Sequence, residues 1–220
     1  VAAGVHRFWQ TFPKAISASA DGKLTVHLYP NQQGEPIEFF TGTARTHEGL
    51  IVPFTQADPA ALQRRFVAMQ QPLFPFASTQ WMCRSGALGP LARAGAPQLY
   101  GKYADRAKAI TQRVDRIFQT LITQHRDNWR KRGVTMDAYG WFAWGDTLHW
   151  VWQKEPKGSP WDIAWDSNYY DKPHMLLSHF ARTGDRRWFD FFLDASWHLM
   201  DVDCVHWDPK WPDGGPSRRC

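Results

Sequence analysis

The segment Asp166–His174, DSNYYDKPH, gathers side chains that sugar chemistry uses. It holds acids, an amide, two tyrosines, a lysine and a histidine within nine residues, and Trp161 and Trp165 precede it. Acids, tyrosine and histidine transfer protons to and from substrates. Its second half, from Asp171 on, also has the form of a helix start, with an aspartate cap and a proline in the first turn. The segment therefore predicts either a catalytic, sugar-binding loop or a polar segment that only precedes a helix.

Tryptophan is the unusual feature of the composition, with 13 residues. A flat indole stacks on the C–H face of a sugar ring while neighbouring polar groups bind the hydroxyls. The alternative is core packing, with each indole N–H bonded locally. The tryptophans that lie beside polar groups are Trp141 and Trp144 near Asp146, Trp150 and Trp152 near His149, and Trp207 beside His206.

The bulk composition is that of a folded protein. The chain has 220 residues, of which 43% are hydrophobic and 21% charged, enough for one large domain or parts of two. The net charge of +5 favours an acidic partner such as a polyanionic sugar. The basic run Arg126–Arg132 is interpreted as a solvated helix end, and no nucleic-acid-binding signature accompanies it. We therefore expect an acidic polysaccharide or oligosaccharide as partner and no nucleic acid.

Metal, membrane and targeting signals are weak. The three cysteines, Cys83, Cys204 and Cys220, lack zinc-type spacing, and their odd number disfavours a closed disulfide framework. No apolar run is long enough to span a membrane. We expect no cofactor and no membrane partner, while a divalent cation such as calcium stays an open alternative. The chain opens without an initiator Met or a signal peptide and is interpreted as a fragment, so the compartment stays open, with secreted or periplasmic as the expectation.

Strands are predicted over residues 1–54. Ala20–Lys23 and Asn31–Gly34 have the composition of turns. The segments rich in β-branched and aromatic residues are VHRFWQ (5–10), LTVHLYP (24–30) and IEFFTGTARTHEGLIVPF (37–54).

A connecting region is predicted over residues 55–103. It begins with a short helix that Asp58 caps and that has Pro59 in its first turn. Proline and glycine then interrupt any longer element up to Pro97.

Helical periodicity begins at residue 104. An apolar face runs from Ile110 to about Arg130, and a second helix is predicted from Asp171 to Thr183. Asp185 caps a third helix at once, which makes an antiparallel helix pair. Because strands and helices are segregated along the chain, we expect an α+β protein of separate layers or domains. Long helices with aromatic, polar loops at one end are typical of a helical toroid.

Several motifs resemble the exo-type rhamnogalacturonan lyase family, also called the YetA-like family. They occur in the family order and touch most of the chain. They are RFWQTFPK (7–14), GTARTHE (42–48), GWFAWGDT (140–147), YDKPHMLLSHFARTGDRRWFD (170–190) and HLMDVDCVHWDP (198–209).

The resemblance implies β-sheet domains followed by an (α/α) toroid. Residues 1–54 would then be a β-sandwich portion, 55–103 a linker and connecting helix, and 104–220 the incomplete N-terminal part of the toroid. This corresponds to an α+β multidomain fragment: a partial β-sandwich followed by the first helices of an (α/α) toroid. The missing partner would be the remainder of the same chain.

The resemblance also implies β-elimination at an acidic, rhamnogalacturonan- or pectin-like polysaccharide. A base removes the proton next to the carboxylate, a cation stabilises the developing enolate, and an acid protonates the leaving oxygen. The expected catalytic residues are Tyr170, His149, His206 and Asn168. The expected substrate-binding residues are Trp141, Trp144, Asp146, Trp165, Tyr169, Arg218 and Arg219.

Two other functions stay open at this point. A glycoside hydrolase on the same toroid would need two carboxylates across a cleft, from among Asp146, Asp166 and Asp171. A non-catalytic family member would bind sugar through its aromatic loops alone. The pair His47-Glu48 is predicted in a strand and would face the cleft or pair with a neighbouring strand.

Overall fold

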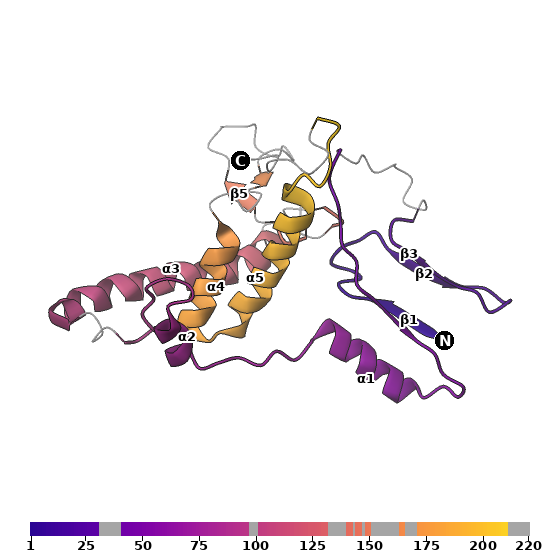
Figure 1. Cartoon of the computed structure of the whole chain (residues 1–220), viewed down its shortest axis with the longest axis horizontal. Helices are drawn as coiled ribbons and strands as arrows, with labels where there is room; N and C mark the ends of the chain where they lie inside the picture. Colours follow the sequence, from indigo (N-terminus) through magenta and orange to yellow (C-terminus); the bar gives the residue numbers. More distant parts are fainter. Residues whose placement is uncertain are drawn as a thin grey trace.

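The described residues form an α+β structure with small antiparallel sheets and five α-helices, which confirms the predicted class at this level. In Figure 1 the N-terminal strands and the first helix lie at one side and the later helices at the other. Among the described helices, none has the length and apolar character that crossing a bilayer requires. The computed structural model describes residues 1–30, 41–96, 101–131, 140–142, 144–146, 148–150, 163–165 and 171–210.

The described strands pair two by two, all antiparallel. β1 (Ala2–Val5) pairs with β4 (Gly49–Val52), with Ala2 opposite Val52. β2 (Ala15–Ala18) and β3 (Leu24–His27) form the hairpin that the turn at Ala20–Lys23 predicts. β5 (Leu148–Trp150) pairs with β6 (Ile163–Trp165), two strands that were not predicted from the sequence. A completed sandwich stays a prediction.

Two strand predictions are wrong, each for a local reason. The chain turns directly after Val5, because Arg7 adopts φ +54° and its carbonyl accepts a hydrogen bond from Thr11 N at 3.1 Å. Residues 41–48, which include His47-Glu48, form no strand; Ala44 N instead donates to Asp201 O at 3.1 Å. β-branched residues favour extended backbone without fixing what it pairs with.

Helix α1 (Pro59–Gln70) begins as predicted, since Asp58 Oδ1 accepts Ala61 N at 3.1 Å. Its Gln70 side chain donates to Val5 O at 2.8 Å and accepts Arg7 N at 3.0 Å. These two bonds tie the end of α1 to the turn that follows β1.

Helix α2 (Thr79–Ser85) lies where the sequence predicts only interrupted chain. Ser78 Oγ accepts Trp81 N at 3.2 Å, and Gly86 ends the helix with φ +71°. Both end signals are present in the sequence, but seven residues are too few for an apolar period to appear.

The three later helices agree with the prediction. α3 (Ala104–Lys131) is joined to α4 (Lys172–Thr183) by the ion pair between Asp115 Oδ1 and Arg182 Nη2, 3.2 Å apart. Asp171 and Asp185 cap α4 and α5 (Arg186–His198), which pack as an antiparallel pair. The core of this pair consists of Leu176, Phe180, Trp188 and Ala195.

A π-turn, η3 (Leu199–Asp203), continues α5. Cys204 N donates to Leu199 O at 3.1 Å, which is the five-residue spacing of a π-helix. The wider turn leaves His198, Asp201 and Asp203 all buried. No propensity in the sequence predicts it.

Candidate functional site

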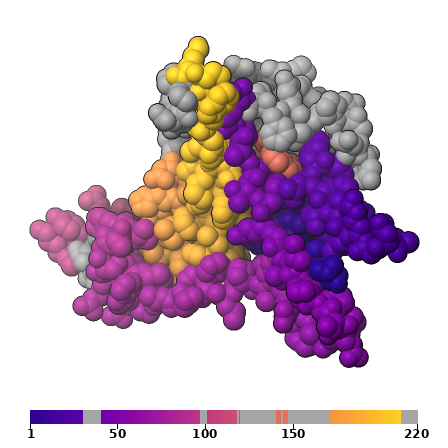
Figure 2. Space-filling model, turned by 45° about the vertical axis from the view of Figure 1, so that its right-hand side comes forward, coloured from indigo at the N-terminus to yellow at the C-terminus, as the bar shows by residue number. Residues whose placement is uncertain are grey.

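Four segments that carry the family resemblance meet at one place, which we call the junction. Hydrogen bonds connect these segments. Gly140 N donates to Gln10 O at 2.8 Å, and Arg45 Nη2 donates to Trp144 O at 3.3 Å. In Figure 2 the yellow segment near residue 200 lies against the violet N-terminal part. The four segments are residues 7–14, 42–48, 140–146 and 198–206.

Asp194 on α5 forms the first buried charge pair of the junction. Its Oδ1 lies 2.7 Å from Arg7 Nη2, and the carboxylate is 4% exposed. The Arg7 guanidinium also lies 5.6 Å from the centre of the Trp144 ring. A buried carboxylate requires such a counter-charge, so this pair fixes the turn after β1 against α5.

His198 lies between two other buried carboxylates. Its Nε2 is 3.6 Å from Asp146 Oδ2 and 3.5 Å from Asp203 Oδ1. All three side chains are at most 6% exposed. The arrangement places segment 140–146 directly against the end of the helix pair.

Asp201 binds the segment that leads into β4. Its Oδ2 accepts Thr46 N at 2.6 Å, and its Oδ1 accepts Thr46 Oγ1 at 2.9 Å. Its own carbonyl accepts Ala44 N at 3.1 Å. Three hydrogen bonds therefore connect one residue of the π-turn to Ala44 and Thr46, the two neighbours of Arg45.

Lys14, Arg45 and His47 form the basic part of the junction. Burial lowers the pKa of His47 to about 4, helped by the positive charges of Lys14 and Arg45, while Asp201 opposes the shift. Burial and the charge of Arg45 lower the pKa of Lys14 to about 8. Burial also lowers the pKa of Arg45, against the charges of Asp201 and Asp194. At neutral pH a neutral imidazole thus neighbours two cations.

Five buried polar atoms of the junction have no hydrogen-bond partner within the described part of the chain. They are His47 Nε2, Arg45 Nη1, Gln10 Oε1, His198 Nδ1 and Asp203 Oδ2. Unsatisfied buried polar atoms are uncommon in folded proteins, because each one costs about 1–3 kcal/mol. His47 Nε2 and Arg45 Nη1 therefore keep unused hydrogen-bonding capacity within the described structure.

Two glycines allow the segments to approach closely. A side chain at Gly145 (φ +95°) would collide with Asp194 O, and one at Gly42 (φ +80°) would collide with Trp207 O. Only glycine combines this backbone conformation with such a contact.

Trp141, Trp144 and Asp146, predicted to bind substrate, lie inside the junction. They are 8%, 9% and 6% exposed. The His47 ring lies 5.4 Å from that of Trp141. Because the indole faces are covered, we assign the two tryptophans to packing beneath the basic residues rather than to sugar stacking.

His206, predicted to be catalytic, is exposed at the edge of the junction. Its Nε2 lies 3.2 Å from Asp201 O, and its backbone N donates to Gly42 O at 2.8 Å. The structure places the backbones of His149 and Trp165 in paired strands β5 and β6. The predicted residues outside the described part are Tyr170, Asn168, Tyr169, Arg218 and Arg219, together with Asp166, a candidate carboxylate for hydrolysis.

Asp171, a candidate carboxylate for hydrolysis, caps α4. Its side chain accepts His174 N at 3.4 Å and is well exposed. This is the structural role that its position before Pro173 predicts.

The sequence alone did not single out Lys14, Arg45 or Asp201. Two of them lie in the quoted motifs RFWQTFPK and GTARTHE, and Asp201 lies in HLMDVDCVHWDP. The sequence signal for these residues is that each lies in one of the quoted motifs. Local spacing does not show that two positions 155 residues apart are in contact.

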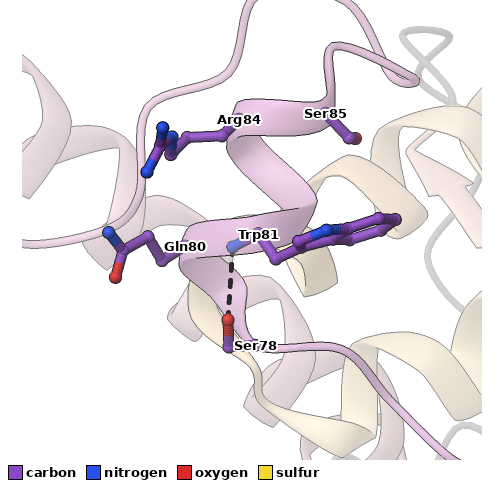
Figure 3. A pocket seen from close by; sticks show the side chains of 5 residues that line it. All are labelled: Ser78, Gln80, Trp81, Arg84 and Ser85. Atoms are coloured by element: carbon purple, nitrogen blue, oxygen red, sulfur yellow. Dashed lines mark hydrogen bonds between the residues drawn. The ribbon is translucent and has the colours of Figure 1, made fainter.

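A metal-binding group and a surface pocket are the other kinds of site considered among the described residues. No group of three or more His, Cys, Asp or Glu side chains among the described residues is arranged to hold a metal ion. A surface pocket at α2 is lined by Ser78, Gln80, Trp81, Arg84 and Ser85. Figure 3 shows the Trp81 indole on one side of the helix and the Gln80 and Arg84 side chains on the other, so they do not converge on one ligand.

Compared with models of known protein families and with curated proteins, the chain matches none of them.

Proposed function

We propose that the chain is part of a polysaccharide lyase that cleaves an acidic, rhamnogalacturonan- or pectin-like polysaccharide by β-elimination. One observation carries the proposal. Four motifs that resemble the exo-type rhamnogalacturonan lyases, and that are far apart in sequence, meet at the junction and supply a neutral histidine beside two cations.

The basic residues of the junction match the demands of the reaction. In this proposal His47 Nε2 takes the proton from the carbon next to the carboxylate, and Arg45 stabilises the negative charge that develops on the carboxylate oxygens. The bond between the neighbouring carbon and the glycosidic oxygen then breaks, and a carbon–carbon double bond forms. Lys14, which is largely protonated at neutral pH, gives the leaving oxygen its proton. A catalytic role for Tyr170 and Asn168 remains a prediction from the sequence, in addition to these three residues.

Exposed indoles next to the junction support a sugar ligand. Trp9 and Trp207 are 60% and 52% exposed. Trp9 lies in the same turn as Arg7, and Trp207 lies against Gly42. In the proposal these faces, rather than those of Trp141 and Trp144, stack on the sugar rings.

The proposed architecture is a partial β-sandwich followed by the first helices of an (α/α) toroid. The antiparallel pair of α4 and α5 supports it, because such pairs are the repeating unit of a toroid. In this proposal the remainder of the same polypeptide closes the substrate cleft.

The direct experiment incubates the longer protein that contains this chain with rhamnogalacturonan and with other uronate polymers. We expect the ultraviolet absorbance of an unsaturated uronate to rise with time. New reducing ends without this absorbance would indicate hydrolysis instead. Binding without any product, seen as a change of tryptophan fluorescence, would indicate a non-catalytic sugar-binding protein.

A further inference from the structure

We propose that Asp201 is a positioning residue, which holds Arg45 and His47 in place by binding the backbone between them. The inference rests on the proposed function for its effect on turnover, but not for its effect on the two side chains themselves.

The geometry supports this role directly. Thr46 is the residue between Arg45 and His47, and both its N and its Oγ1 donate to the Asp201 carboxylate, at 2.6 and 2.9 Å. Charge-assisted bonds of this kind are about twice as strong as neutral ones. The contact to Ala44 N at 3.1 Å adds a third attachment on the other side of Arg45.

Asp201 is itself held firmly. It is 5% exposed and lies in the π-turn η3, at the end of the packed helix α5. π-turns within helices are frequent at functional sites, where they redirect side chains. Thr46, in contrast, is exposed and lies in a segment without regular secondary structure. We therefore expect Asp201, which is buried at the end of α5, to set the position of Thr46.

Asp201 also acts on His47 through its charge. Lys14 and Arg45 disfavour the protonated imidazole, while Asp201 favours it. Glu48, the charged residue that follows His47 in the sequence, pairs with His6 instead: its Oε2 lies 3.1 Å from His6 Nδ1. Removal of the Asp201 charge is therefore expected to lower the pKa of His47 further.

The experiment compares three variants of the longer protein that contains this chain. Asp201→Asn keeps an acceptor for Thr46 N but removes the charge, and Thr46→Val removes only the hydroxyl contact. Asp194→Asn is the control for the His47 titration, because it also neutralises a buried carboxylate of the junction, and that carboxylate acts on Arg7 and Arg45 rather than on His47. The readouts are kcat, KM, the pH titration of the His47 ring by NMR and the urea midpoint.

We expect Asp201→Asn to lower kcat by roughly 100-fold, the cost of displacing a catalytic group by about 1 Å, with a smaller change in KM. The His47 titration should move to lower pH in Asp201→Asn and stay in place in Asp194→Asn. Thr46→Val should lower kcat less and leave the urea midpoint near that of the unaltered protein.

Two outcomes would overturn the inference. One is an unshifted His47 titration in Asp201→Asn; the other is wild-type kcat in Thr46→Val, which decides the matter even if Asp201→Asn does not fold. If the unaltered protein shows no turnover, the proposed function fails, while the His47 titrations still decide whether Asp201 acts on His47.

Discussion

His47 has a neutral ring and, among the described residues, an unpartnered ring nitrogen. Its pKa of about 4 keeps the ring neutral at physiological pH, and its Nε2 is buried with no hydrogen-bond partner in the described part of the chain. The same burial that lowers its pKa also strengthens its interaction with nearby charges. Lys14 is the complementary group, since it is mostly protonated below about pH 8.

These two values predict the pH dependence of turnover. The rate should fall as pH drops through about 4, where His47 takes up a proton, and as pH rises through about 8, where Lys14 loses one. Lys14→Arg should move the alkaline limb upward, because arginine keeps its charge. The exposed Lys23→Arg is the matched control and should leave the profile unchanged. An alkaline limb that stays in place in Lys14→Arg would rule out the role of Lys14.

At the scale of elements, the close contact of segment 140–146 with α5 depends on Gly145. Gly145→Ala should destabilise the protein by about 2 kcal/mol or more, because alanine meets Asp194 O and also adopts φ +95° with strain. Gly22→Ala is the control: Gly22 has φ +84° but nothing near its Cβ position. It should cost only the conformational part, about 1–2 kcal/mol.

Urea denaturation of both variants measures this difference. Equal losses of the free energy of unfolding would show that the contact between Gly145 and α5 contributes nothing beyond backbone strain.

Elements with strong local signals were predictable from the sequence. Asp58, Asp171 and Asp185 marked helix starts correctly, because capping is a local interaction. The π-turn at Leu199–Asp203 and the irregular segment before β4 were not, because each contacts the other across the fold. The contacts of the candidate site have the same origin. Asp146 was predicted from its neighbouring tryptophans, whereas Asp201, Lys14 and Arg45 could not be predicted from local spacing.

At the scale of the whole molecule, many large apolar side chains are exposed. The described sheets have only two strands each, and sheets of this size are marginally stable in water. Exposed apolar surface of this extent is typical of surfaces that pack against another part of a protein. The most exposed examples among the described residues are Leu73 at 98%, Ile51 at 71%, Trp81 at 64% and Trp9 at 60%.

We therefore expect the 220 residues expressed alone to be poorly soluble and inactive. Size-exclusion chromatography and urea denaturation test this directly, with the longer protein as control. A soluble monomer that unfolds cooperatively and has lyase activity would contradict the expectation.

The most direct test of the proposed lyase function, with His47 as the base, is the lyase assay with His47→Gln. On rhamnogalacturonan, we expect the unaltered longer protein to produce unsaturated uronate and His47→Gln to lose at least about 100-fold in kcat, the usual scale of general-base catalysis. His174→Gln, at an exposed histidine of α4, should retain full activity. Full activity in His47→Gln, or no unsaturated product from the unaltered protein, would contradict the account.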